Sequence, residues 1–301
     1  MVYTVTCNPS LDYYLYLPQL PTAGVHRATG AQLTYGGKGI NVSAILARLN
    51  VPTRALGFVG GRFGEKLCDL LTADGIVQDF VSLSQGETRI NVKLRADAEL
   101  DINAAGPTVT QDEWQALLDQ MDALCADDVL VLAGAVPSGL PSDLYARLLA
   151  RANGALTVVD AEGELLRRTL AYHPFLIKPN TEELGALFGR DLHTEEEIIA
   201  CARRLQQEGA RNVLISRGGD GALLLDETGG VHTAPAAVGT VRNTVGCGDS
   251  MVAGFIAGWL IHGDYAAALR LASACGGATA FSDTLATGDE IAQVYAKVGD
   301  A

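Results

Sequence analysis

Short apolar runs alternate with longer, helix-like stretches along most of the chain. Several of the runs are apolar throughout, which is the pattern of strands buried on both faces of a sheet. Their order predicts a parallel sheet with helices on both faces, which is an α/β fold. We predict strands at residues 3–6, 54–59, 129–132, 156–159, 175–177, 213–216 and 222–225. We predict helices at residues 40–49, 64–73, 111–124, 142–152, 195–208, 249–261 and 265–281.

Two segments depart from this alternation. Residues 11–35 and 87–104 have the pattern of paired strands with alternating polar positions, and neither contains a helical stretch. We expect them to form a small antiparallel sheet that projects from the α/β body. Ligands of open α/β folds bind at the carboxyl ends of the strands, so such a sheet would be well placed to cover the ligand.

Composition and charge exclude several classes of protein. The chain has 301 residues, of which 48% are hydrophobic and 19% are charged, so it can bury a core and is not globally disordered. The 22 Lys and Arg residues against 35 Asp and Glu residues give a net charge of −13, which argues against a general nucleic-acid binder. At that charge, a local group of basic residues points to an anionic ligand.

The sequence favours a cytoplasmic protein without a membrane segment. The N-terminal residues have no basic region and contain Asp12, so they do not predict a signal peptide. The longest strongly apolar run, residues 251–261, is too short to span a bilayer. The six cysteines are dispersed and form no CxxC pair, which favours reduced thiols, and the five histidines form no cluster typical of a transition-metal site.

The strongest chemical signal is TVGCGD at residues 244–249, which runs directly into a nearly all-apolar helix. Gly246 and Gly248 permit backbone conformations closed to other residues, and the free N–H groups of a first helical turn form an anion site. Asp249 would repel a phosphate that is merely bound there. It fits a base that takes a proton from a hydroxyl while the amides hold a transferring phosphoryl group. The alternative is a glycine turn with Asp249 as the helix N-cap.

A second signal is GGKGINVS at residues 36–43, a glycine-rich turn at the start of a helix. It is not a Walker A loop, because a glycine follows Lys38, and the chain has no GxGxxG fingerprint after its first strand. The functional interpretation is close backbone approach to a polyhydroxy ligand, with Asn41 in the first turn and the Lys38 ammonium for a phosphate. The alternative is a tight turn with an exposed lysine.

The third signal is TRINVKL at residues 88–94. With a strand period of two, Arg89, Asn91 and Lys93 share one face, and arginine suits bidentate phosphate recognition. The alternative is the solvated face of an edge strand.

Two further motifs are weaker. In KPNTEE at residues 178–183, Asn180 and Glu183 lie three apart on one helix face and could supply oxygen atoms to Mg²⁺ or its waters. The local pattern favours the alternative, a capping box at the helix start. In SRGGDG at residues 216–221, a tight turn joins two apolar strands, and a hairpin without a ligand explains it equally well.

Taken together and in this order, the motifs resemble the ribokinase/PfkB family of carbohydrate kinases. The resemblance runs almost from end to end of the chain. It is most similar to the branch that acts on phosphorylated ketohexoses, the 1-phosphofructokinases and tagatose-6-phosphate kinases. The matching motifs are NPSLD (8–12), GGKGINVS (36–43), TRINVKL (88–94), KPNTEE (178–183), SRGGDGA (216–222) and TVGCGDSMVAGF (244–255).

The resemblance implies a ribokinase-like fold. The α/β body would comprise residues 1–11, 36–86 and 105–301, and a β-sheet lid would comprise residues 12–35 and 87–104. ATP and Mg²⁺ are the implied co-substrates, and pairing of two lids implies a homodimer. The implied reaction is phosphorylation of fructose 1-phosphate at its 6-hydroxyl. The alternatives are tagatose 6-phosphate or fructose 6-phosphate phosphorylated at the 1-hydroxyl, or a non-catalytic sugar-phosphate sensor.

The resemblance also implies a role for each motif. Asp249 would be the base that deprotonates the acceptor hydroxyl. The anion hole would use the amides of Gly246, Cys247 and Gly248. The phosphosugar would contact Asp12, Gly37, Lys38, Asn41, Arg89, Asn91 and Lys93, of which Asp12 and Asn41 would bind hydroxyls and Lys38 and Arg89 the phosphate. The nucleotide would contact Lys178, Ser216, Gly218, Gly221 and Thr244. Asn180 and Glu183 would organise Mg²⁺.

Three positions depart from the usual family pattern. Cys247 stands where family members often have alanine, which leaves the backbone amide in place. Ala135 lacks a hydroxyl found at that point in related chains. Thr284 stands where glycine is common.

Overall fold

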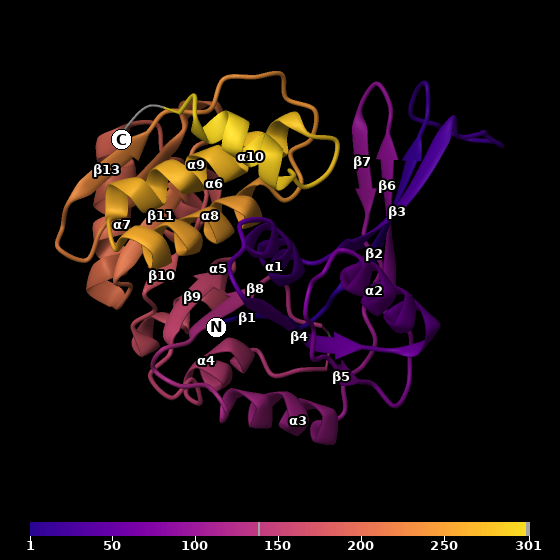
Figure 1. Ribbon diagram of the computed structural model, residues 1–301, viewed down its shortest axis with the longest axis horizontal. Coiled ribbons are helices and arrows are strands. Elements are labelled where there is room, and N and C mark those ends of the chain that lie inside the picture. The colour runs from indigo at the N-terminus through magenta and orange to yellow at the C-terminus, as the bar shows by residue number, and fades with distance from the viewer. Residues whose placement is uncertain (138, 299–301) are drawn as a thin grey trace.

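A large, mostly parallel sheet forms the centre of the computed structural model, which describes residues 1–137 and 139–298. In this part of the chain the sheet has nine strands, in the order β13-β12-β11-β10-β9-β8-β1-β4-β5 (Figure 1). The pairs from β11 to β5 are parallel, whereas β12 and β13 run antiparallel at one edge. The strands are β1 (Val2–Thr6), β4 (Thr53–Val59), β5 (Val81–Ser82), β8 (Val129–Ala133), β9 (Leu156–Asp160), β10 (Leu176–Ile177), β11 (Asn212–Ser216), β12 (Ala222–Leu225) and β13 (Val231–Ala234).

Helices cover both faces of this sheet, as the alternating sequence pattern predicts. None of them, within residues 1–137 and 139–298, has the length and apolar character needed to span a bilayer. The helices are α1 (Lys38–Arg48), α2 (Gly61–Ala73), α3 (Gln111–Met121), α4 (Leu144–Leu149), α5 (Gly163–Arg167), α6 (Thr181–Leu187), α7 (Glu195–Glu208), α8 (Cys247–His262), α9 (Tyr265–Phe281) and α10 (Gly288–Tyr295).

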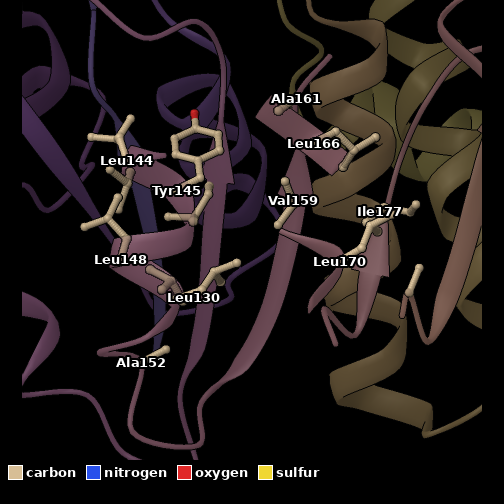
Figure 2. Close-up of a cluster of buried hydrophobic side chains, with 14 of the residues drawn as sticks. Leu130, Leu144, Tyr145, Leu148, Ala152, Val159, Ala161, Leu166, Leu170 and Ile177 are labelled. Carbon is tan, nitrogen blue, oxygen red and sulfur yellow. The ribbon is translucent and has the colours of Figure 1, made fainter. Parts of the chain in front are cut away.

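The continuous apolar runs arise because the central strands are buried on both faces and contribute side chains to two hydrophobic cores. In β8, Leu130 and Leu132 belong to the same buried cluster as residues of α3, α4 and α7, whereas Val129 and Val131 belong to a second cluster with residues of α1, α8 and α9. Figure 2 shows part of the first core, where α4 packs on the strands β8 and β9. Fully burying a side chain of this size contributes roughly 1.5–3 kcal/mol. The two-sided burial therefore fixes where the carboxyl ends of the strands lie.

The smaller sheet projects from one end of the body (Figure 1). Its strand order is β3-β2-β6-β7, formed by β2 (Ser10–Tyr16), β3 (Gly30–Gly36), β6 (Arg89–Arg95) and β7 (Glu99–Ile102). The expectation of wholly antiparallel pairing was wrong, because β2 and β6 are parallel. Each segment is a hairpin whose first strand leaves the body in the same direction, and the two hairpins meet along those first strands.

The two faces of the small sheet differ in polarity. Asp12 lies opposite Asn91 on one face, and this face is polar. The other face carries Leu11, which is buried against α2, and at its far end the exposed side chains of Leu100 and Ile102.

All seven predicted strands of the body are present, with bounds that differ by at most a residue or so. The helix predicted at 142–152 is shorter, since the chain turns at Asn153, which has a positive φ of 47°. The prediction missed β5 and β13, which are short edge strands, and the short helices α5 and α10. These elements are short and bury few side chains.

Candidate active site

A cleft of about 450 Å³ opens where the carboxyl ends of the central strands meet the polar face of the small sheet and the start of α8. It brings together most of the predicted site residues from motifs far apart in the sequence. Those lining it are Asp12, Gly37, Lys38, Asn41, Arg89, Asn91, Lys93, Lys178, Asn180, Glu183, Ser216, Gly246, Gly248 and Asp249. Ala135 lines it as well, so the hydroxyl that this position lacks would have faced the cleft.

Asp249 is held in the first turn of α8, but it is not the cap of that helix. The N-cap is Gly246, whose φ of 81° is a left-handed conformation that favours glycine. The first amide of the helical ladder here is that of Ser250, which donates to the carbonyl of Gly246 at 2.8 Å. The amides of residues 247–249 precede that ladder and form the anion-binding end of the helix.

The Asp249 carboxyl group is buried and oriented by another motif. The Asn41 amide Nδ2 donates to Asp249 Oδ2 at 2.8 Å. Burial and the negative charge of Asp160 raise the pKa of Asp249 to about 6, although Asn41, Lys38 and Lys178 oppose the shift. The group is therefore a carboxylate at neutral pH with a pKa close to that expected of a general base.

Asp12 is fixed by two donors on its own side of the cleft. Its Oδ1 atom accepts hydrogen bonds from Ser10 Oγ at 2.7 Å and from Asn91 Nδ2 at 2.9 Å. A Cβ atom on Gly36 would lie 2.6 Å from both Asp12 and Ser10, so only glycine fits beside this pair. Asn91, predicted to contact the sugar, thus orients Asp12 in this structure.

The three cations predicted to contact the phosphosugar differ in the partners that they already have. Lys93 is already paired with Asp101 at 2.7 Å, across the β6–β7 hairpin. Lys38 lies 3.5 Å from Asp160. Arg89 donates to two backbone carbonyls and, within residues 1–137 and 139–298, forms no ion pair with a carboxylate. Arg89 is therefore the cation best placed to receive an incoming phosphate.

Asp160 is a site residue that the sequence analysis missed. It ends β9 at the cleft and is 1% exposed, between the ammonium groups of Lys38 and Lys178 at 3.5 and 3.6 Å. A signal for it existed, since the residue follows a buried apolar run at the carboxyl end of a parallel strand. Asn8, Ser10 and Asn103 also line the cleft and were not predicted as site residues.

Asn180 and Glu183 form the capping box that the local pattern favoured. Asn180 Oδ1 accepts from the Glu183 amide at 2.7 Å, and Glu183 Oε2 accepts from the Asn180 amide at 2.9 Å. Both side chains nevertheless line the cleft, and burial raises the pKa of Glu183. Among the described residues, 1–137 and 139–298, no group of three or more His, Cys, Asp or Glu side chains could hold a metal ion.

Four predicted residues do not line the cleft. Gly218 and Gly221 belong to the β11–β12 hairpin, and a Cβ on Gly221 would collide with the carbonyl of Ala234, so the hairpin itself requires that glycine. Thr244 is exposed. Burial raises the pKa of the Cys247 thiol to about 11, so Cys247 is a neutral thiol that offers its backbone amide.

The family model for pfkB carbohydrate kinases matches residues 6–290. The chain belongs to the pfkB family of carbohydrate kinases. It is thus a phosphotransferase that acts on a sugar hydroxyl, as the resemblance of its motifs implied.

Relatives of this pfkB kinase match over nearly its whole length. A 1-phosphofructokinase of Bacillus subtilis is 40% identical over 99% of this chain and 98% of its own. A D-tagatose-1-phosphate kinase of Bacillus licheniformis is 37% identical over 99% and 98%. The structure of phosphofructokinase-2 from Escherichia coli in complex with substrates and products has a TM-score of 0.94 at 29% identity, covering 99% of both chains. A ribokinase from Arabidopsis thaliana, 20% identical with a TM-score of 0.78 over 98% of both chains, confirms the ribokinase-like fold.

We predict that Asp249→Asn retains the fold and loses most turnover. General-base catalysis typically contributes about 10²- to 10⁴-fold, so kcat should fall by a factor of that order. In the wild type, kcat/KM should decline as the pH drops below about 6, because protonation removes the base. Purified Asp249→Asn and the exposed control Asp112→Asn are compared by ADP release. A kcat for Asp249→Asn near that of the wild type would exclude it as the base.

Proposed function

We propose that this kinase transfers the γ-phosphoryl group of ATP to the 6-hydroxyl of fructose 1-phosphate and forms fructose 1,6-bisphosphate. The observation that carries the proposal is that one cleft holds a buried base at a helix N-terminus on one side and the Arg89 guanidinium, bonded only to backbone carbonyls, on the other. The names of the two bacterial relatives support a phosphate on carbon 1 of the acceptor. Asp249 also argues against a sugar-phosphate sensor, because sensing requires no base.

In this proposal the acceptor lies between Asp12 and Asp249. Asp249 takes the proton of the 6-hydroxyl while that oxygen bonds to the γ-phosphorus and the bond from the γ-phosphorus to ADP breaks. The amides of residues 246–248, of which those of Cys247 and Gly248 belong to the free first turn of α8, stabilise the charge on the transferring group. Asp12, already oriented by Ser10 and Asn91, positions the sugar hydroxyls.

ATP and Mg²⁺ are the proposed co-substrates. Lys178 and Ser216 line the cleft, and in this proposal the nucleotide binds there and extends past Gly218, Gly221 and Thr244. Asn180 and Glu183 offer oxygen atoms that fit Mg²⁺ only together with waters and nucleotide phosphates, which is the usual way this ion is held. When bound, the ion neutralises phosphate charge.

The small sheet is the proposed lid, residues 12–35 and 87–104, and also the proposed dimer interface. Its polar face lines the cleft, whereas the opposite face leaves Leu100 and Ile102 45% and 54% exposed. Cross-strand neighbours share a face, so these side chains continue the apolar surface of Val92 and Leu94. A second copy of the same sheet would bury this surface in a homodimer.

We predict that Arg89→Ala raises the KM for fructose 1-phosphate by roughly 10- to 100-fold, because a hydrogen bond to a charged group is worth about 1.5–3 kcal/mol. The KM for ATP should hardly change. Arg89→Lys should recover part of the loss, since an ammonium cannot reproduce the bidentate geometry. Arg95→Ala, on the same face of β6 but outside the cleft lining, is the control.

The measurement is kcat/KM on fructose 1-phosphate, tagatose 1-phosphate, tagatose 6-phosphate, fructose 6-phosphate and free fructose. The wild type should favour fructose 1-phosphate and show little activity on fructose. A wild type that favours fructose, or an Arg89→Ala loss that is equal on both sugars, would contradict the phosphate-binding role. A preference for another sugar phosphate would replace the proposed acceptor.

We predict that Asn180→Ala and Glu183→Ala raise the Mg²⁺ concentration needed for half-maximal activity more than they raise the KM for the phosphosugar. Both changes also remove a helix cap. Thr110→Ala removes the matching capping box on α3, whose residues do not line the cleft, and controls for that loss. Unchanged Mg²⁺ titrations in both folded variants would leave this motif with a capping role alone.

We predict that Ile102→Asp lowers the molecular mass in solution from dimer to monomer, because it places a charge in the proposed lid interface. Leu260→Asp changes a similarly exposed apolar residue on α8 and should leave the mass unchanged. Light scattering after size-exclusion chromatography measures both. A monomeric wild type, or a dimeric Ile102→Asp, would refute the interface.

A further inference from the structure

Asp160 is the buried charge in the cleft to which the proposed reaction assigns no ligand. It is 1% exposed, and neither carboxylate oxygen has a hydrogen-bond partner within residues 1–137 and 139–298. Transferring a carboxylate out of water is costly unless other charges compensate for it. A buried polar group without hydrogen bonds, lining a reaction cleft, requires a functional explanation.

Two ammonium groups provide that compensation. Lys38 Nζ lies 3.5 Å and Lys178 Nζ lies 3.6 Å from the same atom, Asp160 Oδ1. Both distances exceed the roughly 2.7–2.9 Å of a charge-assisted hydrogen bond. The carboxylate therefore attracts both ammonium groups without forming a short hydrogen bond to either, and each ammonium keeps its donors for a ligand.

The two lysines come from different elements of the fold. Lys38 is the first residue of α1, beside the glycine turn proposed for the sugar, and Lys178 follows β10 at the nucleotide side. The side chain of Lys178 is 5% exposed, whereas that of Lys38 is 34% exposed toward the cleft. A lysine side chain is long and flexible, so its ammonium stays in one place only if something anchors it.

We propose that Asp160 is a positioning residue that sets the spacing between two phosphate-binding ammonium groups, Lys38 for the phosphosugar and Lys178 for the nucleotide. In-line transfer needs donor and acceptor held close to the reacting geometry, and small misplacements of the groups that hold them are costly. Because both lysines share one carboxylate, that carboxylate fixes the position of the phosphosugar relative to the nucleotide. The inference rests on the proposed function, which assigns the two ligands.

The rival explanation is that Asp160 binds the metal ion. Carboxylate oxygens suit Mg²⁺, and Glu183 lines the same cleft. The structure favours the lysines, because two ammonium groups already flank Asp160 and Glu183 serves the capping box of α6. The two explanations differ in what they predict for Asp160 variants. Positioning of the lysines predicts a change in the KM of each substrate, whereas metal binding predicts a change in the Mg²⁺ requirement.

The test is the isosteric variant Asp160→Asn, with fructose 1-phosphate and ATP varied separately at saturating Mg²⁺. We expect both KM values to rise by about tenfold and kcat to fall, while the circular dichroism spectrum stays that of the wild type. Glu162→Gln is the matched control. It removes a carboxylate 3.8 Å from Lys38 that is 67% exposed, so it should alter the phosphosugar KM by no more than about fivefold.

Double variants separate positioning from a general structural effect. In a Lys38→Met background, Asp160→Asn should no longer raise the phosphosugar KM but should still raise that for ATP. In a Lys178→Met background the pattern should reverse. Equal effects on both substrates in every background would overturn the proposal. Unchanged KM values with a raised Mg²⁺ requirement would overturn it in favour of a metal ligand.

A second variant covers the case in which Asp160→Asn does not fold. Asp160→Glu keeps the charge but lengthens the side chain by one methylene, so it should raise both KM values through altered spacing, and wild-type kinetics would overturn the proposal. If the wild type prefers another sugar phosphate, the same variants are measured on that compound. A wrong acceptor and a wrong role for Asp160 therefore give different results.

Discussion

The structure depends on one electrostatic arrangement, a buried carboxylate at the start of a helix whose first amides are left without backbone partners. The amides of residues 247–249 favour negative charge, and the Asp249 carboxylate brings negative charge to the same turn. The turn accommodates both the amides and the carboxylate because the buried apolar side chains along α8 anchor that helix in the core. Gly254 and Gly258 let α9 approach closely, since a Cβ on Gly258 would lie 2.7 Å from Ala268 Cα. The apolar packing of these two helices thus holds a polar turn in place.

The rest of the cleft balances charge around that turn. Asp160 faces Lys38 and Lys178, Asp249 is oriented by Asn41, and Asp12 is held by two uncharged donors. In a chain with a net charge of −13, this local arrangement offsets the repulsion that a phosphorylated ligand would meet. Arg89 contributes a further positive charge, because its hydrogen bonds go to backbone carbonyls and it forms no ion pair with a carboxylate of residues 1–137 and 139–298.

The sequence predicted what depends on local pattern. Apolar runs located the body strands, and the glycine loop before an apolar helix located Asp249. The parallel pairing of β2 with β6 could not be predicted, because it depends on how two distant hairpins leave the body. The partner of Lys93 depends on the register of β6 with β7, and the importance of Asp160 depends on two lysines from other elements. The domain bounds, the nucleotide residues and the metal role remain predictions.

The parallel pairing of β2 with β6 also has a consequence for the order of folding. Asp12 and Asn91, which meet in the small sheet, are 79 positions apart, and α1, β4, α2 and β5 lie between them. Contacts of such separation carry a large loop-closure entropy, so they form favourably only after the intervening strands and helices have assembled. The Asn41–Asp249 hydrogen bond spans 208 positions, so both sides of the cleft form only after distant parts of the chain have come together. During synthesis, Asp12 and Asn91 emerge well before Asp249, so the residues that orient the acceptor are made before the anion-binding end of α8.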